Sequence, residues 1–306
     1  MRPVAQLLGP ALVAGLLVAC SGGGSAEEGL PTVKGEYGAK PAVQVEKGSK
    51  PSGKLASEVL SRGDGPKVRA GDLLVADYLG KNFRSSKVFD NSYDRGAPAA
   101  FTLKAGPGGV ISGWVKSLAG VPVGSRVLLV APPKDGYGKA GNAQAGIQAS
   151  DSLVFVVDLI ASYRSGQALP ESTPVKALPA GLPTVEGEQD PKVAVPEGAD
   201  PPSKPRTTVI ATGTGPKVVP GRLAIVQYTA VSWDNKPLAS TWQGGPQGVP
   251  VGAQQPSPFD LLVGAPVGSR VLLELPAQTG ADAATGSVAV VIDILGQHGP
   301  AKEKAA

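Results

Sequence analysis

The sequence predicts an α+β fold built from two related units, each a twisted antiparallel β-sheet wrapped around a short α-helix. Short apolar segments bounded by glycine or proline predict strands, among them residues 73–78, 126–130 and 153–160. Residues 112–118 have the pattern of a helix, with Ser112 as a plausible N-cap and Gly120 as the stop signal. Packing a short helix against a sheet buries the apolar face of both elements, which is why the α+β class is favoured.

Length and composition limit what this protein can be. A chain of 306 residues suggests two domains, and its 42% of apolar residues is enough for folded cores despite 42 glycines and 30 prolines. A net charge of +4 argues against a dedicated nucleic-acid-binding protein. The single cysteine excludes an intramolecular disulfide, and the single histidine excludes a histidine metal cluster. That histidine, His298, precedes glycine, proline and lysine and is predicted to be solvated.

The N-terminus has the features of an export signal. Arg2 precedes an apolar stretch, residues 7–18, that is too short to span ~30 Å of hydrocarbon permanently. The sequence Leu17-Val18-Ala19-Cys20 resembles a bacterial lipobox, in which the cysteine receives a lipid and the preceding peptide is removed. We therefore expect residues 1–19 to be a lipoprotein signal peptide, residues 20–44 a flexible tether, and the protein to be extracytoplasmic and anchored to the bacterial cell membrane through Cys20. An ordinary signal peptide with a chance cysteine is the alternative.

The chain contains an internal repeat. Residues 30–36 recur with one change at 182–188, and residues 123–129 recur identically at 267–273. The copies are 150 residues apart at Tyr78 and Tyr228 but only 135 apart at Ser152 and Ser287, so the second copy has lost loop material. We predict domains at residues 45–165 and 200–297, a linker rich in proline and glycine at 166–199, and a disordered tail at 298–306.

The first copy carries an ordered set of motifs: Phe89-Asp90-Asn91-Ser92, Asp94-Arg95-Gly96-Ala97-Pro98, Val110-Ile111-Ser112-Gly113-Trp114, Pro132-Pro133, Tyr137-Gly138 and Leu153-Val154-Phe155. In this order and spacing the set resembles the FKBP-type peptidyl-prolyl isomerases, from about Val59 to Tyr163. Such enzymes lower the barrier of ~18–20 kcal/mol to rotation about a peptide bond. No bond breaks in that reaction, so we expect no nucleophile, metal or cofactor.

The resemblance assigns a role to each candidate residue. Trp114 would form the floor of a pocket for the proline ring, with walls from Tyr78, Phe89, Phe101, Phe155, Val110 and Ile111. The backbone N–H of Ile111 and the hydroxyl of Tyr137 would donate to substrate carbonyls. Asp90 would face the twisting amide, held by Arg95, and Ile147 would lie on a flap over the mouth. Taken singly, a tryptophan in a sheet protein is more often a core residue and an aspartate more often a turn residue; their occurrence together favours the pocket.

Departures from the family pattern predict a looser mouth. Ala99 stands where the family usually has an aromatic residue, and Gln148-Ala149 stands where it usually has a pair of prolines. We therefore expect activity that is weaker or differently selective. The second copy has Leu238-Ala239 opposite Phe89-Asp90 and Gln254-Gln255-Pro256-Ser257-Pro258 opposite the helix start, which predicts an FKBP-like fold without a working pocket.

The functional prediction is a lipid-anchored isomerase that acts on X–Pro bonds of exported proteins, with catalysis in the first copy. Its partners would be proline-containing segments of secreted or unfolded proteins, with macrolide immunophilin ligands as further candidates. The main alternative is a non-catalytic chaperone or protein-binding lipoprotein. A solute-binding lipoprotein is disfavoured because small tandem β domains lack a large two-lobed architecture.

Overall fold

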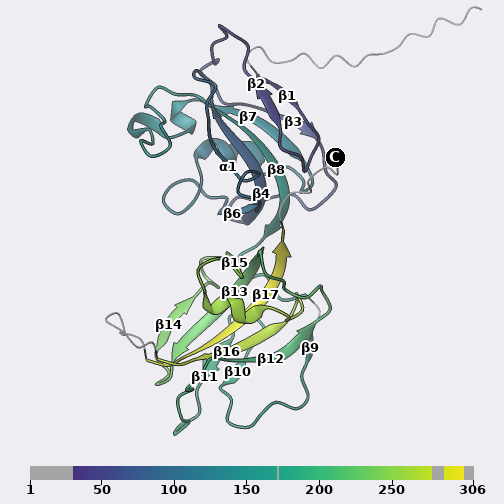
Figure 1. Ribbon diagram of the computed structural model, residues 1–306, viewed down its shortest axis with the longest axis vertical. Helices are drawn as coiled ribbons and strands as arrows, with labels where there is room; N and C mark the ends of the chain where they lie inside the picture. Colours follow the sequence, from purple (N-terminus) through teal and green to yellow (C-terminus); the bar gives the residue numbers. More distant parts are fainter. Residues whose placement is uncertain (1–29, 171, 278–285, 300–306) are drawn as a thin grey trace, which may run out of the picture.

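The computed structural model describes residues 30–170, 172–277 and 286–299, which form four β-sheets in two units. Figure 1 shows the first unit above the second, joined where the ends of two long strands meet. The predicted lipidation residue Cys20 and the predicted signal peptide before it lie outside the described residues. Within the described ranges, no helix is both long and apolar enough to cross a membrane.

The first unit is a six-stranded antiparallel sheet with one helix against it. In sheet order its strands are β3 (Ala56–Ser61), β7 (Arg126–Ala131), β8 (Leu153–Tyr163), β4 (Leu73–Asn82) and β5 (Val88–Asn91), with β6 (Ala99–Thr102) also paired to β4. Helix α1 (Ser112–Leu118) packs on the sheet through the buried side chains of Trp114 and Leu118. Its N-cap is Ile111, whereas the Ser112 hydroxyl donates to Asp135 at 3.1 Å. Gly120 adopts a φ of +87°, so the helix stops where the sequence predicted.

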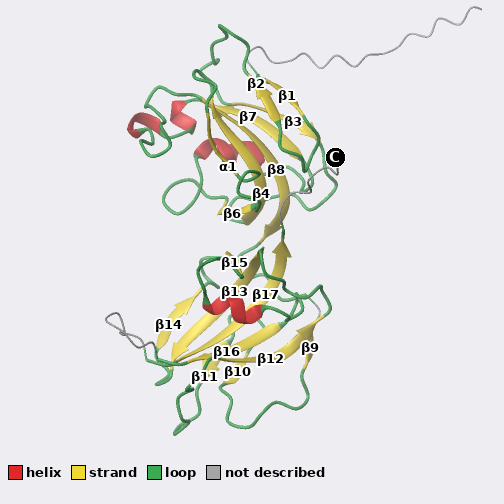
Figure 2. Ribbon diagram, in the orientation of Figure 1, coloured by secondary structure: helices red, strands yellow, loops and turns green. Residues whose placement is uncertain are grey.

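The second unit is a seven-stranded antiparallel sheet with the same order of corresponding strands. These are β14 (Pro237–Ser240), β13 (Arg222–Ser232), β17 (Val288–His298), β16 (Arg270–Leu275), β12 (Arg206–Gly213) and the added edge strand β9 (Ser172–Pro174), with β15 (Gln247–Val251) paired to β13. The 3₁₀-helix η3 (Pro258–Leu262) lies where the repeat predicted an α-helix (Figure 2).

The predicted α+β class with a helix in each of two domains is therefore wrong. The described residues are mostly β, and α1 is the one α-helix among them. The difference lies in the second copy, where the segment that corresponds to α1 forms only the five residues of η3. The chain leaves the helical region again at Val263 after five residues, which leaves no room for a second α-helical turn.

Each unit also carries a small hairpin that the sequence assigned to flexible segments. Strands β1 (Thr32–Lys34) and β2 (Ala42–Gln44) pair in the predicted tether, and β10 (Thr184–Glu186) and β11 (Lys192–Ala194) pair in the predicted linker. Arg126 and Arg270, from the identical repeats, donate to carbonyls of their respective hairpins, Gly35 at 2.7 Å and Gly187 at 2.6 Å. The tether and linker predictions are wrong for these stretches, because a distant arginine holds each hairpin.

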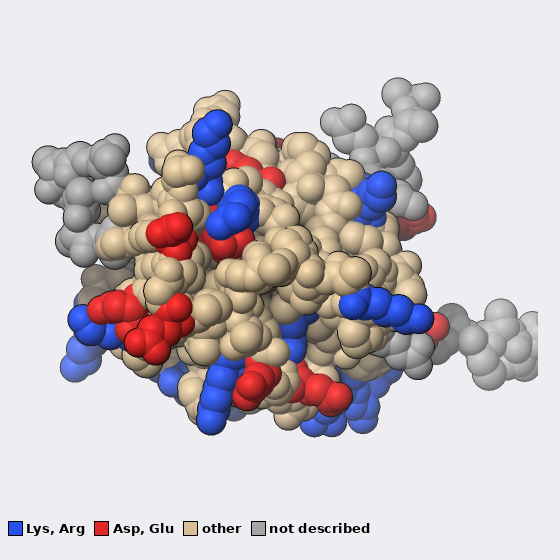
Figure 3. All heavy atoms as spheres, turned by 90° about the horizontal axis from the view of Figure 1, so that it is seen from below, with Lys and Arg blue, Asp and Glu red and all other residues tan. Residues whose placement is uncertain are grey.

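The two units are docked through an apolar interface. Residues from both sheets bury one another in a shared cluster: Leu73, Val75 and Tyr163 from the first unit and Ile225 and Leu295 from the second. Around this cluster the Gln227 side chain accepts from the backbone N–H of Gly166 at 3.1 Å and donates to the carbonyl of Gln167 at 2.7 Å. Away from the junction, the face seen in Figure 3 carries basic and acidic side chains interspersed among neutral ones.

His298 belongs to this junction and is not a solvated tail residue. Its Nε2 lies 2.7 Å from the hydroxyl oxygen of Tyr163, at the end of β17. Burial, with a smaller effect from Arg222, lowers the pKa of His298 from 6.5 to about 4. The prediction of a solvated side chain and a tail starting at residue 298 is thus wrong, because strand pairing extends β17 through His298.

We expect the protein to lose stability as the pH falls from about 6.5 to about 4, the two pKa values of unfolded and folded His298. In that window the unfolded chain binds a proton that the folded protein excludes, so protonation favours unfolding. His298→Gln removes this titration, and the drop in unfolding free energy between pH 7.5 and pH 4.5 should be smaller in the variant. Urea unfolding at both pH values measures it; equal drops in variant and parent would contradict the expectation.

Candidate active site

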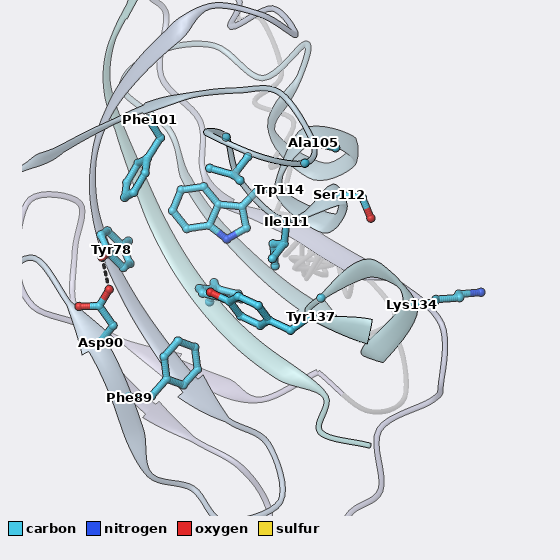
Figure 4. Close-up of a pocket in the computed structure, with 15 residues that line it drawn as sticks. Tyr78, Phe89, Asp90, Phe101, Ala105, Ile111, Ser112, Trp114, Lys134 and Tyr137 are labelled. Atoms are coloured by element: carbon cyan, nitrogen blue, oxygen red, sulfur yellow. Dashed lines mark hydrogen bonds between the residues drawn. The ribbon is translucent and has the colours of Figure 1, made fainter. Parts of the chain in front are cut away.

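The first unit contains a cavity of about 500 Å³ between its sheet, α1 and two loops. It brings together most of the residues that the sequence predicted, and those that line it are Tyr78, Phe89, Asp90, Phe101, Val110, Ile111, Trp114, Tyr137 and Phe155. They come from β4, β5, β6, β8, α1 and the loops before and after them. Figure 4 shows these side chains converging on one hollow.

Trp114 is surrounded by the edges of three other rings. The centroid of its indole lies 5.5 Å from Tyr78, 5.2 Å from Phe101 and 5.5 Å from Phe155, each near perpendicular. Such edge-to-face contacts fix the indole plane more firmly than area burial alone. Trp114 is 3% exposed, and its Nε1 has no hydrogen-bond partner among the described residues. The result is a rigid, apolar floor.

A hydrogen-bonded group of polar side chains lies at one wall of the cavity, beside its aromatic floor. The Tyr78 hydroxyl donates to one oxygen of Asp90, and Arg95 donates to the other oxygen. Arg95 also donates to the Tyr78 hydroxyl oxygen at 2.9 Å, which closes a triangle of three side chains. Burial, reinforced by the hydrogen bond to Asp90, raises the pKa of Tyr78 to about 12. Tyr78 therefore stays protonated, and the Asp90 carboxylate is fixed in orientation at the cavity wall.

Tyr137 approaches from the opposite side. It precedes the short 3₁₀-helix η2 (Gly138–Ala140), which follows η1 (Pro133–Asp135), and its side chain is 38% exposed. In Figure 4 its ring extends from this loop across the cavity, so that its hydroxyl faces the hollow. Asp135 anchors the same loop to α1 through Ser112 and Lys116, and Lys116 lowers the pKa of that carboxyl. The hydroxyl of Tyr137 is thus held at the rim of the apolar floor.

The structure places two predicted residues elsewhere. Arg95 lies behind Asp90 and does not line the cavity, in keeping with a supporting position. Ile147 is 5% exposed, packs in the same core cluster as Trp114, and is not among the residues that line the cavity. Its backbone exchanges two hydrogen bonds with Asn142, which draws this part of the loop onto the core.

Several lining residues were not predicted as site residues: Ala105, Gly106, Gly109, Ser112, Lys134 and Gly136. Gly109 has a structural reason to be glycine, since a Cβ there would lie 1.9 Å from the carbonyl oxygen of Lys104. Only glycine allows that tight loop beside the cavity. Lys134 had no comparable signal. In the ranges that the structure describes, His, Cys, Asp and Glu do not gather in any group of three that could hold a metal ion.

The second unit places different residues at the corresponding positions. Phe259 of η3 and Tyr228 of β13 have ring centroids 6.0 Å apart and pack on the second core. Leu238 and Ala239, opposite Phe89 and Asp90, are exposed on the edge strand β14. The second unit therefore has no counterpart of Asp90 or Trp114 at these positions.

Comparisons with known proteins agree with this geometry. The family model described as FKBP-type peptidyl-prolyl cis-trans isomerase matches residues 65–160. The FK506-binding protein of Streptomyces anulatus is 38% identical over 122 residues, which are 40% of this chain and 96% of that protein. FK506-binding protein 2 of Dictyostelium discoideum is 41% identical over 120 residues, 39% of this chain and 87% of that protein.

Among solved structures, the crystal structure of FkpA from Escherichia coli is similar over 38% of this chain and 52% of that chain, with 39% identity and a TM-score of 0.33. The matched family region holds the cavity, its aromatic floor and the Asp90 wall. The chain therefore belongs to the FKBP-type peptidyl-prolyl cis-trans isomerases, enzymes that interconvert cis and trans peptide bonds before proline.

Proposed function

We propose that this protein is a prolyl isomerase for exported proteins and that the cavity over Trp114 is where the reaction takes place. The family in general binds proline-containing substrates and macrolide ligands. One observation carries the proposal: an aromatic floor opens into a cavity of about 500 Å³ whose walls hold the Asp90 carboxylate and the Tyr137 hydroxyl. Macrolide immunophilin ligands are candidate ligands of the same cavity.

The chemistry follows from what a twisting amide needs. A planar amide is polar because of its resonance, and rotation removes that resonance at a cost of ~18–20 kcal/mol. With the proline ring on Trp114, an apolar and water-poor site disfavours the polar planar form relative to the twisted one. The backbone N–H of Ile111 and the hydroxyl of Tyr137 would hold the flanking carbonyls, so that rotation is confined to one bond. No proton needs to move.

Asp90 would act through its fixed charge. Tyr78 and Arg95 each donate to one of its oxygens, so the carboxylate cannot rotate away from the cavity wall. A preorganised charge that faces the rotating carbonyl interacts differently with the planar and the twisted amide, and that difference can change the rate. It does not serve as a base, since the reaction transfers no proton.

We expect Asp90→Ala to lower kcat/KM for a short X–Pro peptide about tenfold, equivalent to ~1.4 kcal/mol of transition-state stabilisation. Stability should change little, because the Asp90 and Arg95 side chains are 43% and 47% exposed and such ion pairs contribute ~0–1 kcal/mol. A protease-coupled assay or NMR exchange measures the rate.

Asp94→Ala is the matched control, since Asp94 is also paired with a cation, Lys40, but lies outside the cavity lining. It should leave kcat/KM unchanged. Equal losses in both variants would remove the special role of Asp90. The alternative is a chaperone without catalysis. It would be favoured if the unmodified protein bound unfolded chains but left the cis–trans exchange rate of the X–Pro bond at its spontaneous value.

We further propose that the second unit is a duplicate of the first without its pocket and that the protein is a lipoprotein outside the cytoplasm. The repeated arginine motif with its hairpin supports the duplication, and the lipobox-like sequence before Cys20 supports the anchor. Bacterial cells fed an alkyne fatty acid should label the full-length protein, and Cys20→Ala should abolish the label. Labelling that persists in Cys20→Ala would contradict the anchor.

A further inference from the structure

A second cavity, of about 270 Å³, lies at the junction of the two units and adjoins the candidate active site. It shares Phe101 and Gly109 with the first cavity, so the two cavities adjoin at these residues. The remaining lining comes from both units: Leu73, Ala100, Thr102 and Gly108 from the first and Pro246, Gln247 and Gly248 from the second. None of these side chains is charged.

Two edge strands face this junction cavity. Within the described residues β6 pairs only with β4, and β15 pairs only with β13, so each strand has one unpaired edge. The two strands contact each other, and Figure 1 places β15 directly below β6. A Cβ on Gly248 would lie 2.6 Å from the Cβ of Ala100, so the absence of a side chain at Gly248 permits this close approach.

The junction is held in place by contacts on both sides. The shared apolar cluster fixes the two sheets, and the Tyr163–His298 hydrogen bond of 2.7 Å ties the ends of β8 and β17 together. Ser165 also donates to the carbonyl of Trp242 at 3.1 Å, close to the turn that leads into β15. The two units that line the groove are therefore held together by contacts on both sides of it.

We propose that this junction groove is a second substrate subsite, which binds the extended polypeptide on one side of the isomerised proline. A polypeptide that leaves the active site past Phe101 and Gly109 would enter the groove, which residues of both edge strands line. An extended chain can pair with such an edge through main-chain hydrogen bonds, which are independent of its sequence. An uncharged, backbone-rich lining suits unfolded polypeptide better than it suits an ion or a lipid headgroup. This inference rests on the proposed function of the adjoining cavity.

Gln247→Trp tests the subsite, because Gln247 is exposed at the start of β15 and an indole there would fill the groove. We would assay the full chain with a four-residue X–Pro peptide and with the same peptide extended by six neutral residues on each side. The unmodified protein should have a lower KM for the extended peptide. The variant should raise that KM roughly three- to tenfold relative to the KM for the short peptide, as for the loss of one or two backbone hydrogen bonds.

Gln254→Trp is the matched control, since Gln254 is also an exposed glutamine of the second unit but does not line the groove. It should leave the ratio of the two KM values as in the parent, and thermal unfolding should show that both variants are folded. An unchanged ratio in Gln247→Trp would overturn the subsite. So would a change of sedimentation coefficient in that variant without a change in KM, because the groove would then be an interface between two copies.

A binding measurement separates this inference from the proposed function. Amide resonances of Thr102 and Gln247 should shift on titration with the extended peptide and stay in place with the short one. Absence of turnover of the short peptide by the unmodified protein would overturn the proposed function, whatever the shifts. Normal turnover with no shift at either amide would overturn the subsite alone.

Discussion

Replacing Trp114 with alanine is expected to destabilise the first unit by about 3–5 kcal/mol, the usual cost of deleting a large buried aromatic side chain. Its indole is 3% exposed and contacts three other rings, so the surrounding side chains would have to collapse into the space it leaves. The same change removes the floor of the cavity, so isomerisation of a short X–Pro peptide should fall to near its spontaneous rate. Urea unfolding followed by circular dichroism gives the stability, and a coupled assay gives the rate.

Trp242→Ala is the matched control for this change. Trp242 is 5% exposed in the second unit, and its Nε1, like that of Trp114, has no hydrogen-bond partner among the described residues. Its loss should also lower stability but leave the short-peptide rate per folded molecule unchanged. Equal loss of activity in both variants would mean that Trp114 acts only through folding. Where Trp114→Ala fails to fold, Trp114→Phe keeps an aromatic floor and should retain part of the activity.

Nine of the residues named from the sequence line this cavity, because they belong to motifs whose order along the chain can be recognised without a structure. Phe89-Asp90 and the helix start at Val110–Trp114 lie on neighbouring elements, and the structure brings both to one cavity. The position of Ile147 is harder to predict, because it depends on how its loop folds back. Two backbone hydrogen bonds with Asn142 determine that folding. Gly109 could have been predicted only with knowledge of the Lys104 carbonyl beside it.

Two errors in the fold have a common physical cause, since both depend on contacts between distant segments. The three-residue strands at 32–34 and 42–44 have little propensity of their own and become ordered because Arg126, more than 80 residues away, binds their turn. The sequence around His298 predicts a solvated side chain, but Tyr163 of the other unit lies against it. The α-helix expected in the second copy was inferred from similarity to the first, whereas this segment forms the shorter 3₁₀-helix η3.

Arg126→Met is expected to lower the free energy of unfolding by about 3–5 kcal/mol, the range found when one partner of a buried ion pair is removed. Both side chains of the Arg126–Asp158 pair are 1% exposed. Arg126 donates to both oxygens of Asp158, at 2.6 and 2.7 Å, and to the carbonyls of Gly35 and Ala39, at 2.7 and 2.6 Å. Methionine would leave a carboxylate buried without its cation and two carbonyls without a donor, so the β1–β2 hairpin should detach.

Hydrogen exchange at residues 32–44 measures that detachment directly, alongside urea unfolding of the whole chain. The double variant Arg126→Met/Asp158→Leu should recover part of the lost stability, because it removes the uncompensated charge. It leaves the hairpin carbonyls without a donor, and the Gly38 N–H and the Tyr93 hydroxyl without their acceptor. Arg270→Met is the internal comparison: it breaks the repeated ion pair with Asp293, but Arg270 is 11% exposed, so water can reach the site and the loss should be smaller. If Arg126→Met and Arg270→Met cost the same, burial does not set the strength of these pairs. If the double variant is no more stable than Arg126→Met, unpaired polar groups at the hairpin, and not the isolated charge of Asp158, account for the loss.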